Sequence, residues 1–247
     1  MLEGNHDLLP VLLKNSEENR KKYAHLNLGE YLVVYQFTCQ IDGEDKKGMY
    51  KYLPGGQSTA LHNAAFENLE QEQYRMLPLN MEGVIELLLS DQKGEQQNFL
   101  NMDLVQARQK VQQEEILSWV VTNERCQYGA NVLLRSDIME QIGNILGEDY
   151  FVVPSSVHEV LIIQEQNKEA AEEINQVIDA VNRKEVREQD QLGEYALLYD
   201  RQKKCLVSSK NWQPFMLPEK GKGWKIEPAE SVSGAKKMKE PVKRTII

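Results

Sequence analysis

The chain has 247 residues, of which 41% are hydrophobic and 27% charged, and its formal net charge is −9. This length allows one large domain or two small ones with a sizeable core, and the negative charge argues against a general nucleic-acid-binding surface. From Glu219 onward, however, eight Lys/Arg stand against four Glu, which gives this tail about +4 and leaves about −13 on the rest.

Cysteine usage and hydropathy predict a cytoplasmic protein without a membrane span. Cys39, Cys126 and Cys205 are an odd number at wide spacing, with no Cys-x-x-Cys pair and no nearby second His to complete a zinc site. Reduced thiols in the cytosol are the expectation. The N-terminus lacks the basic region of a secretory signal, and no apolar run approaches the roughly 20 residues that span a bilayer. We expect no membrane contact, no cofactor and no metal.

The sequence of the N-terminal half predicts a β-hairpin that is preceded and followed by a helix. Residues 8–23 carry Leu9, Leu12 and Leu13, which favours a helix. Residues 31–40 are rich in β-branched and aromatic side chains and predict a strand, which returns over residues 49–53 after a turn. A stripe of apolar residues at helical spacing predicts a helix over residues 58–69.

The middle of the chain is less patterned. A second short helix is expected after Pro78, and residues 91–101 have little to bury and predict a mobile loop. Because both flanks are patterned, this loop is either a boundary between subdomains or an insertion into one domain. A weak surface helix is expected over residues 104–115.

The stretch from Trp119 to Gln164 has the strongest pattern. Two strands are expected at residues 117–122 and 130–134, joined as a hairpin. A helix follows from Ser136, with Gly147 as its C-terminal stop. Two further strands at residues 150–153 and 157–163 are nearly all apolar, which is typical of central strands covered on both faces.

The remaining segments complete an α+β fold of antiparallel β-hairpins with packed helices. Residues 168–181 predict an amphipathic helix, and residues 195–208 a last hairpin. We therefore expect a single α+β body over residues 1–210, with a subdomain boundary near 91–101 as an open alternative, and an irregular to disordered basic tail over 211–247.

Several blocks, in order, resemble a domain-of-unknown-function family of the DUF5688 type from anaerobic Gram-positive bacteria. The similarity covers roughly residues 17–205, with Val152 where Leu is usual, and the blocks are YAH…EYLVVY at 23–35, LHNAAFENL at 61–69, TNE…GA at 122–130, VVPSSVHEV at 152–160 and VN…LLYDR ending at Arg201. The resemblance implies a small bacterial cytoplasmic protein with a variable charged tail, often encoded near mobile elements. It implies no activity, cofactor or partner.

One turn holds the residue types of a hydrolase: Ser155, Ser156, His158 and Glu159 could supply a nucleophile, a base and an orienting acid. In an extended chain, however, Ser156 and His158 have Cβ atoms about 6 to 7 Å apart, beyond hydrogen-bond reach. The chain also lacks a Gly-x-Ser-x-Gly elbow. A turn whose hydroxyls satisfy backbone groups is therefore favoured over catalysis.

A second candidate is the binding turn formed by Thr122, Asn123, Glu124 and Arg125, at the end of a strand, where scaffolds often present binding groups. If the two turns converge, Glu124, His158 and Glu159 could together bind a cation, although no motif shows this convergence.

These observations favour a non-enzymatic interaction or regulatory protein that binds an unknown protein partner. The alternatives are a small hydrolase or metal-dependent enzyme, and a weak nucleic-acid contact through the basic tail, where Trp212 and Trp224 could stack on bases.

Overall fold

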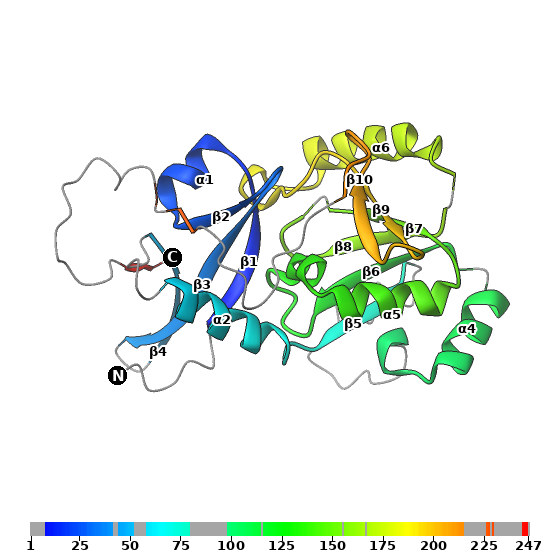
Figure 1. The fold of residues 1–247 in the computed structure, drawn as a ribbon, viewed down its shortest axis with the longest axis horizontal. Coiled ribbons are helices and arrows are strands. Elements are labelled where there is room, and N and C mark those ends of the chain that lie inside the picture. Colours follow the sequence, from blue (N-terminus) through cyan, green and yellow to red (C-terminus); the bar gives the residue numbers. More distant parts are fainter. Residues whose placement is uncertain are drawn as a thin grey trace. The chain divides into compact units, whose positions relative to one another are not determined.

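The computed structural model describes residues 8–41, 44–51, 58–79, 98–114, 116–154, 156–165, 167–214, 226–227, 229 and 244–246. The chain divides into two compact units, the first formed by residues 1–72 and 217–247 and the second by residues 73–216 (Figure 1). Both contain antiparallel sheets and helices, which confirms the predicted α+β class. Within the described residues, no helix combines the length and apolar character needed to cross a bilayer.

The sheet of the first unit is organised around its long strand β3 (Tyr31–Ile41), which confirms the strand predicted over residues 31–40. On one side β3 pairs with β1 (Leu9–Lys14). On the other side it pairs first with β2 (His25–Leu28) and then with β4 (Glu44–Tyr50). The short strand β11 (Arg244–Ile246) pairs with β4, so a segment from the C-terminal tail belongs to this sheet.

The helix expected over residues 8–23 is wrong for its first half. Leu9 to Leu13 are buried at every position rather than on one helical stripe, and they form β1. Pro10 is tolerated there because β1 lies at an edge of the sheet, where a missing N–H need not cost a ladder bond. Only α1 (Glu17–Lys22) is helical, and the Ser16 hydroxyl caps it by accepting from the Asn19 N–H.

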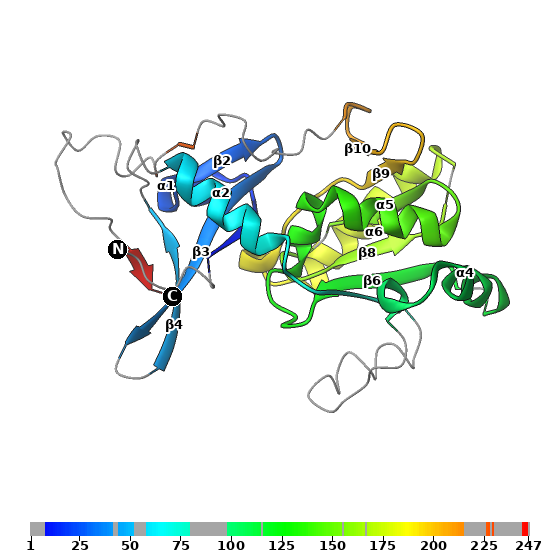
Figure 2. The same cartoon turned by 60° about the horizontal axis from the view of Figure 1, so that its bottom comes forward.

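The helix predicted over residues 58–69 is confirmed as α2 (Ser58–Leu69). Figure 2 shows α2 lying across the sheet of its unit, where it contacts β1. The returning strand, expected at residues 49–53, begins earlier, at Glu44. The helix expected after Pro78 lies outside the described residues.

The second unit has a six-stranded antiparallel sheet in the order β10-β9-β7-β8-β6-β5. Its strands are β5 (Tyr74–Pro78), β6 (Ser118–Asn123), β7 (Tyr150–Val153), β8 (Val160–Ile163), β9 (Leu197–Asp200) and β10 (Cys205–Ser208). As predicted, β7 and β8 are central, and β9 with β10 is the last hairpin. Alternate residues of a strand face opposite sides of the sheet, so helices can cover both.

Two helices use these two faces. The helix α6 (Ala170–Lys184) packs through Ile174 and Ile178 against a cluster that includes Phe151 of β7. The neighbouring Tyr150 points the other way and donates its hydroxyl to the Met139 carbonyl of α5 (Ser136–Leu146). Helix α5 ends at Gly147, whose φ of 85° is left-handed, as the predicted glycine stop requires.

One predicted strand of this unit is wrong. Residues 130–134 belong to a fully buried 3-10 helix, η3 (Gly129–Leu134), so the expected hairpin with β6 does not form. Strand β8 also starts three residues later than predicted, because residues 157–158 form a bend. The predicted surface helix is confirmed as α4 (Leu104–Gln113).

The edge strand β5 is closed by the side chain of Asn98. Its Oδ1 accepts from the Met76 N–H at 3.0 Å, and its Nδ2 donates to the Tyr74 carbonyl at 2.9 Å. This amide makes the hydrogen bonds that a neighbouring strand would make, so these backbone groups of the β5 edge cannot pair with another chain. Asn98 precedes a short 3-10 helix, η2 (Phe99–Asn101), whereas residues 91–97 of the loop predicted there lie outside the described residues.

Candidate functional site

The two polar turns singled out in the sequence meet in the second unit. The first loop (residues 123–129) connects β6 to η3, and the second loop (residues 154–159, of which Ser155 lies outside the described residues) connects β7 to β8. The Thr122 hydroxyl donates to the carbonyl of His158 at 2.8 Å, and the Ala130 N–H donates to the Val157 carbonyl at 3.3 Å. These bonds join the two loops directly.

Gly129 permits this close approach. A Cβ atom at this position would lie 2.4 Å from the Thr122 hydroxyl oxygen, 2.5 Å from the His158 carbonyl oxygen and 2.6 Å from the Asn123 nitrogen. Two of these three neighbours are backbone atoms that cannot rotate away. The requirement for glycine here comes from space and not from an unusual φ.

The imidazole of His158 lies where the loops meet, and both of its nitrogens have neighbours. Nδ1 accepts a hydrogen bond from the Tyr128 N–H at 3.2 Å, so the proton of the neutral ring belongs on Nε2. Nε2 lies 3.5 Å from Oδ1 of Asp190, which follows α6 in the short 3-10 helix η4 (Glu188–Asp190). The other carboxylate oxygen of Asp190 pairs with Arg187 at 2.7 Å.

Ser156 has a structural contact rather than a catalytic one. Its hydroxyl oxygen accepts from the His158 N–H at 3.0 Å, and the side chain is buried. Ser156 also forms a β-bridge with Gln191, beside Asp190. The Ser156 hydroxyl thus bonds the backbone of His158, and backbone pairing joins this loop to η4 and Gln191.

The first loop is closed by Asn123. This buried side chain donates from Nδ2 to the Gln127 carbonyl at 2.9 Å and accepts the Gln127 N–H on Oδ1 at 3.2 Å. Cys126 and Tyr128 adopt left-handed backbone angles within the loop. The buried Thr122 and Asn123 thus hold the loop in place, while Glu124 and Arg125 are exposed.

Asp190 was not among the predicted site residues. Glu159 was the candidate for an orienting acid in the hydrolase alternative, whereas the carboxylate at the imidazole belongs to a residue 32 positions further along the chain. Glu159 is half-buried. The charged segment that contains Asp190 carries no periodicity that could have connected it with His158, because the pairing depends on how η4 returns beside the second loop.

The chemistry available to this arrangement is limited. The Ser156 hydroxyl accepts a backbone N–H, whereas the ring nitrogens of His158 contact the Tyr128 N–H and Asp190, so the nucleophile and base are not coupled as a hydrolase requires. Within the described part of the chain, no group of three or more His, Cys, Asp or Glu residues could hold a metal ion.

Two hollows lie elsewhere on this unit, beside α5. One, of about 290 Å³, includes Leu104, Asp137 and Gln141 in its lining. The other, of about 410 Å³, includes Tyr199, and burial first, then the charge of Glu140, raises the pKa of that phenol to about 12. Glu140 lines both hollows and pairs with Lys204 at 2.5 Å.

The structure therefore defines an α+β protein in which hydrogen bonds join the first and second loops beside His158. The sequence profile described as "Family of unknown function (DUF5688)" matches residues 18–201, about three quarters of the chain, and the chain belongs to this family. No curated protein matches the chain. No solved structure matches it either.

Proposed function

We propose that this protein is a non-enzymatic interaction or regulatory protein of the bacterial cytoplasm, which binds a partner protein through the first and second loops of its second unit. The observation that carries the proposal is that the buried polar residues of the loops differ in role from the exposed ones. The buried Thr122, Asn123 and Ser156 form hydrogen bonds within and between the loops, whereas Glu124 and Arg125 are exposed.

Such a surface suits recognition because it is held before a partner arrives. Loops that are ordered in advance lose less conformational entropy on binding. Exposed charges at an interface contribute mostly to the rate of association and to the choice of partner. An acid and a base side by side on a fixed loop favour a partner that presents the complementary pair.

A small hydrolase that uses Ser155, Ser156, His158 and Glu159 is the alternative. It gains least from the geometry, since the Ser156 hydroxyl is directed to the His158 N–H. If that alternative held, Ser156→Ala would abolish turnover of a model ester. No partner protein would then bind the first and second loops.

The proposal is tested by exchanging charges on the first loop. The double substitution Glu124→Arg with Arg125→Glu keeps the net charge and alters only exposed side chains. We expect a partner that co-purifies with the wild-type protein from its host to bind the purified variant about tenfold more weakly, a loss of about 1.4 kcal/mol.

A matched control exchanges an acid and a base on the exposed face of α6, by Asp179→Arg with Arg183→Asp. This variant should bind the partner like the wild type in calorimetry with purified proteins. Equal affinity of the loop variant and the control would refute the assignment of the binding surface to the loops.

A further inference from the structure

The outer edge of β2 in the first unit already holds an added strand segment from the same chain. The His25 N–H donates to the Glu227 carbonyl at 2.8 Å, and the Glu227 N–H donates to the His25 carbonyl at 2.7 Å. The Ala229 N–H then donates to the Lys51 carbonyl at 3.0 Å. We call residues 226–229 the resident segment; of these, Ile226, Glu227 and Ala229 are described.

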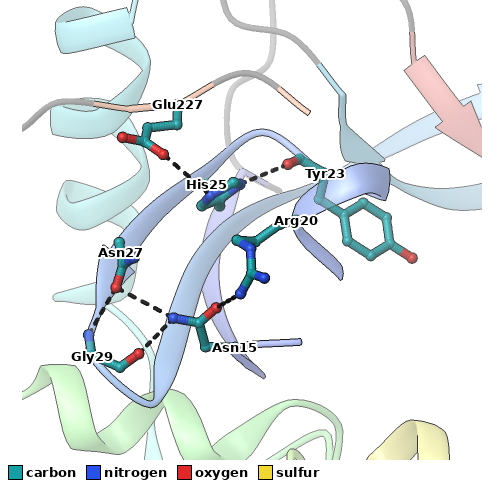
Figure 3. Close-up of polar contacts among 7 residues, drawn as sticks. All are labelled: Asn15, Arg20, Tyr23, His25, Asn27, Gly29 and Glu227. Carbon is teal, nitrogen blue, oxygen red and sulfur yellow. Dashed lines mark hydrogen bonds and ion pairs between the residues drawn. The ribbon is translucent and has the colours of Figure 1, made fainter. Parts of the chain in front are cut away.

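The side chain of His25 points from this edge toward the resident segment (Figure 3). The imidazole is only 1% exposed, and its Nδ1 donates to the Tyr23 carbonyl at 3.0 Å. Nε2 lies 3.7 Å from the Glu227 carboxylate and makes no hydrogen bond within the described part of the chain. Because Nδ1 uses its proton on the Tyr23 carbonyl, Nε2 attracts a carboxylate only when the ring carries a second proton, and in that form the imidazole selects an acid opposite it.

The resident segment uses only part of the edge. Backbone groups alternate between the two sides of a strand, so Asn27 directs its N–H and carbonyl to the same side as His25. No backbone group among the described residues pairs with Asn27 on that side. Its side chain is held away from the edge, because Oδ1 accepts from the Gly29 N–H at 2.9 Å (Figure 3).

We propose that the outer edge of β2, from His25 to Asn27, is a strand-addition site for an extended segment of a partner protein that carries a carboxylate opposite His25. The partner segment displaces the resident segment, whose Glu227 marks the position of the required acid. Main-chain hydrogen bonds to His25 and Asn27 supply affinity, and the imidazole supplies selectivity. Because the pairing is antiparallel, the partner residue opposite Asn27 lies two positions before the acid.

This site is separate from the two loops of the second unit and does not depend on their function. The resident segment competes at the high effective concentration of a tethered ligand, so a free peptide binds the intact edge weakly. Release of the resident segment should therefore strengthen the binding of a peptide in trans.

The test uses the full-length chain and a fluorescent peptide of residues 222–231, KGWKIEPAES. Ala229 is completely buried, so Ala229→Asp dislodges the resident segment, whereas Ala229→Gly leaves it in place. We expect fluorescence anisotropy to show saturable binding to Ala229→Asp that is about tenfold tighter than to wild type or Ala229→Gly. Glu227→Lys is a second releasing variant if Ala229→Asp does not fold.

Changes in the peptide then test the chemistry without altering the protein. With the His25 imidazole protonated, Gln in place of the acid should weaken binding about threefold, as expected for a partly exposed ion pair. An N-methyl group on the acid removes the N–H that bonds His25 and should abolish binding. In the complex, exchange of the Asn27 amide proton should slow.

Three results would overturn the proposal. One is a folded releasing variant that does not bind the peptide, and another is undiminished binding of the N-methyl peptide. The third is a concentration-dependent dimer of the releasing variant that excess peptide leaves intact, which would assign the edge to a second copy of the chain.

Discussion

Gly129 sets how closely the first and second loops approach each other. The space left for its missing side chain is bounded by the Thr122 hydroxyl and two backbone atoms, so even a methyl group requires the loops to separate. Separation would stretch the bonds by which Thr122 and Tyr128 hold His158. The geometry of the candidate binding surface thus depends on a residue that carries no chemistry of its own.

We expect Gly129→Ala to lower the free energy of unfolding by about 3 kcal/mol, at the upper end of the usual overpacking penalty. Gly143→Ala in α5 is the matched control, since its added Cβ would meet the Tyr199 ring at 3.0 Å, and Ala gains about 1 kcal/mol in a helix. Denaturant unfolding, followed by the fluorescence of the buried Trp119, measures both. A Gly129→Ala protein as stable as Gly143→Ala would show that the loops yield easily.

At this scale the sequence predicted where polar residues gather but not which ones interact. Ser156 and His158 are indeed neighbours, yet they meet through a backbone N–H and not through the ring. The acid beside the ring is Asp190, which only the tertiary fold brings there. Residue types in a turn therefore indicated a polar cluster, and the contacts within it required the structure.

Elements were predicted well where the sequence carries a specific local signal. These signals are the apolar stripe of α6, the glycine stop of α5, and the β-branched and aromatic residues of β3 and β7. Residues 9–13 and 130–134 are apolar without a clear period, since every position is buried, and such short runs fit a strand or a helix equally well. Tertiary contacts decided between the two, giving β1 in one case and η3 in the other.

His62 of α2 is bonded to the sheet of the first unit, and its burial makes the stability of that unit depend on pH. The Tyr35 hydroxyl and Nδ1 of His62 are 2.7 Å apart, and both side chains are buried. Burial lowers the pKa of His62 below its ordinary value of 6.5 and raises the pKa of Tyr35. The fold therefore favours the neutral imidazole.

We expect the free energy of unfolding to fall as the pH is lowered through about 6.5, because the unfolded chain then takes up a proton that the folded His62 resists. The loss should continue until the pH reaches the lowered pKa of the folded state. In His62→Gln, which does not titrate, unfolding by urea at pH 7.5 and 5.5 should show a smaller difference than in the wild type.

Tyr35→Phe is the control for this pH effect. It removes the hydrogen bond at a cost of about 1 kcal/mol but keeps the titrating imidazole. Its stability should therefore fall with acid as steeply as that of the wild type. An equal slope in His62→Gln would mean that other groups cause the pH dependence.

For the whole molecule, the C-terminal segment matters more than its composition suggests. The sequence favours an irregular to disordered basic tail over residues 211–247, and most of that range lies outside the described residues. Two described parts are nevertheless tied to the first unit, since Arg244–Ile246 pairs with β4 and Glu227 pairs with β2. Short pairings of this kind leave no periodic signal in a segment rich in Lys, Pro and Gly.

Truncation after Met216 should therefore do more than remove charge. It exposes the outer edges of β2 and β4, and we expect a loss of about 2 kcal/mol or more from the hydrogen bonds removed. Unpaired strand edges also favour association between chains. Chemical denaturation and sedimentation velocity measure the two effects; a tail that only adds solubility would leave the unfolding midpoint unchanged.

A nucleic-acid contact through the tail must be tested without removing the segments that pair with the sheet. Loss of binding on truncation would be ambiguous, because the truncated sheet is altered as well. Replacing Lys236, Lys237 and Lys239 by Gln removes three positive charges while Arg244–Ile246 and Glu227 stay in the chain. If the tail binds nucleic acid, this variant should keep its unfolding midpoint but lose affinity and salt dependence together, since each phosphate contact contributes to the salt slope.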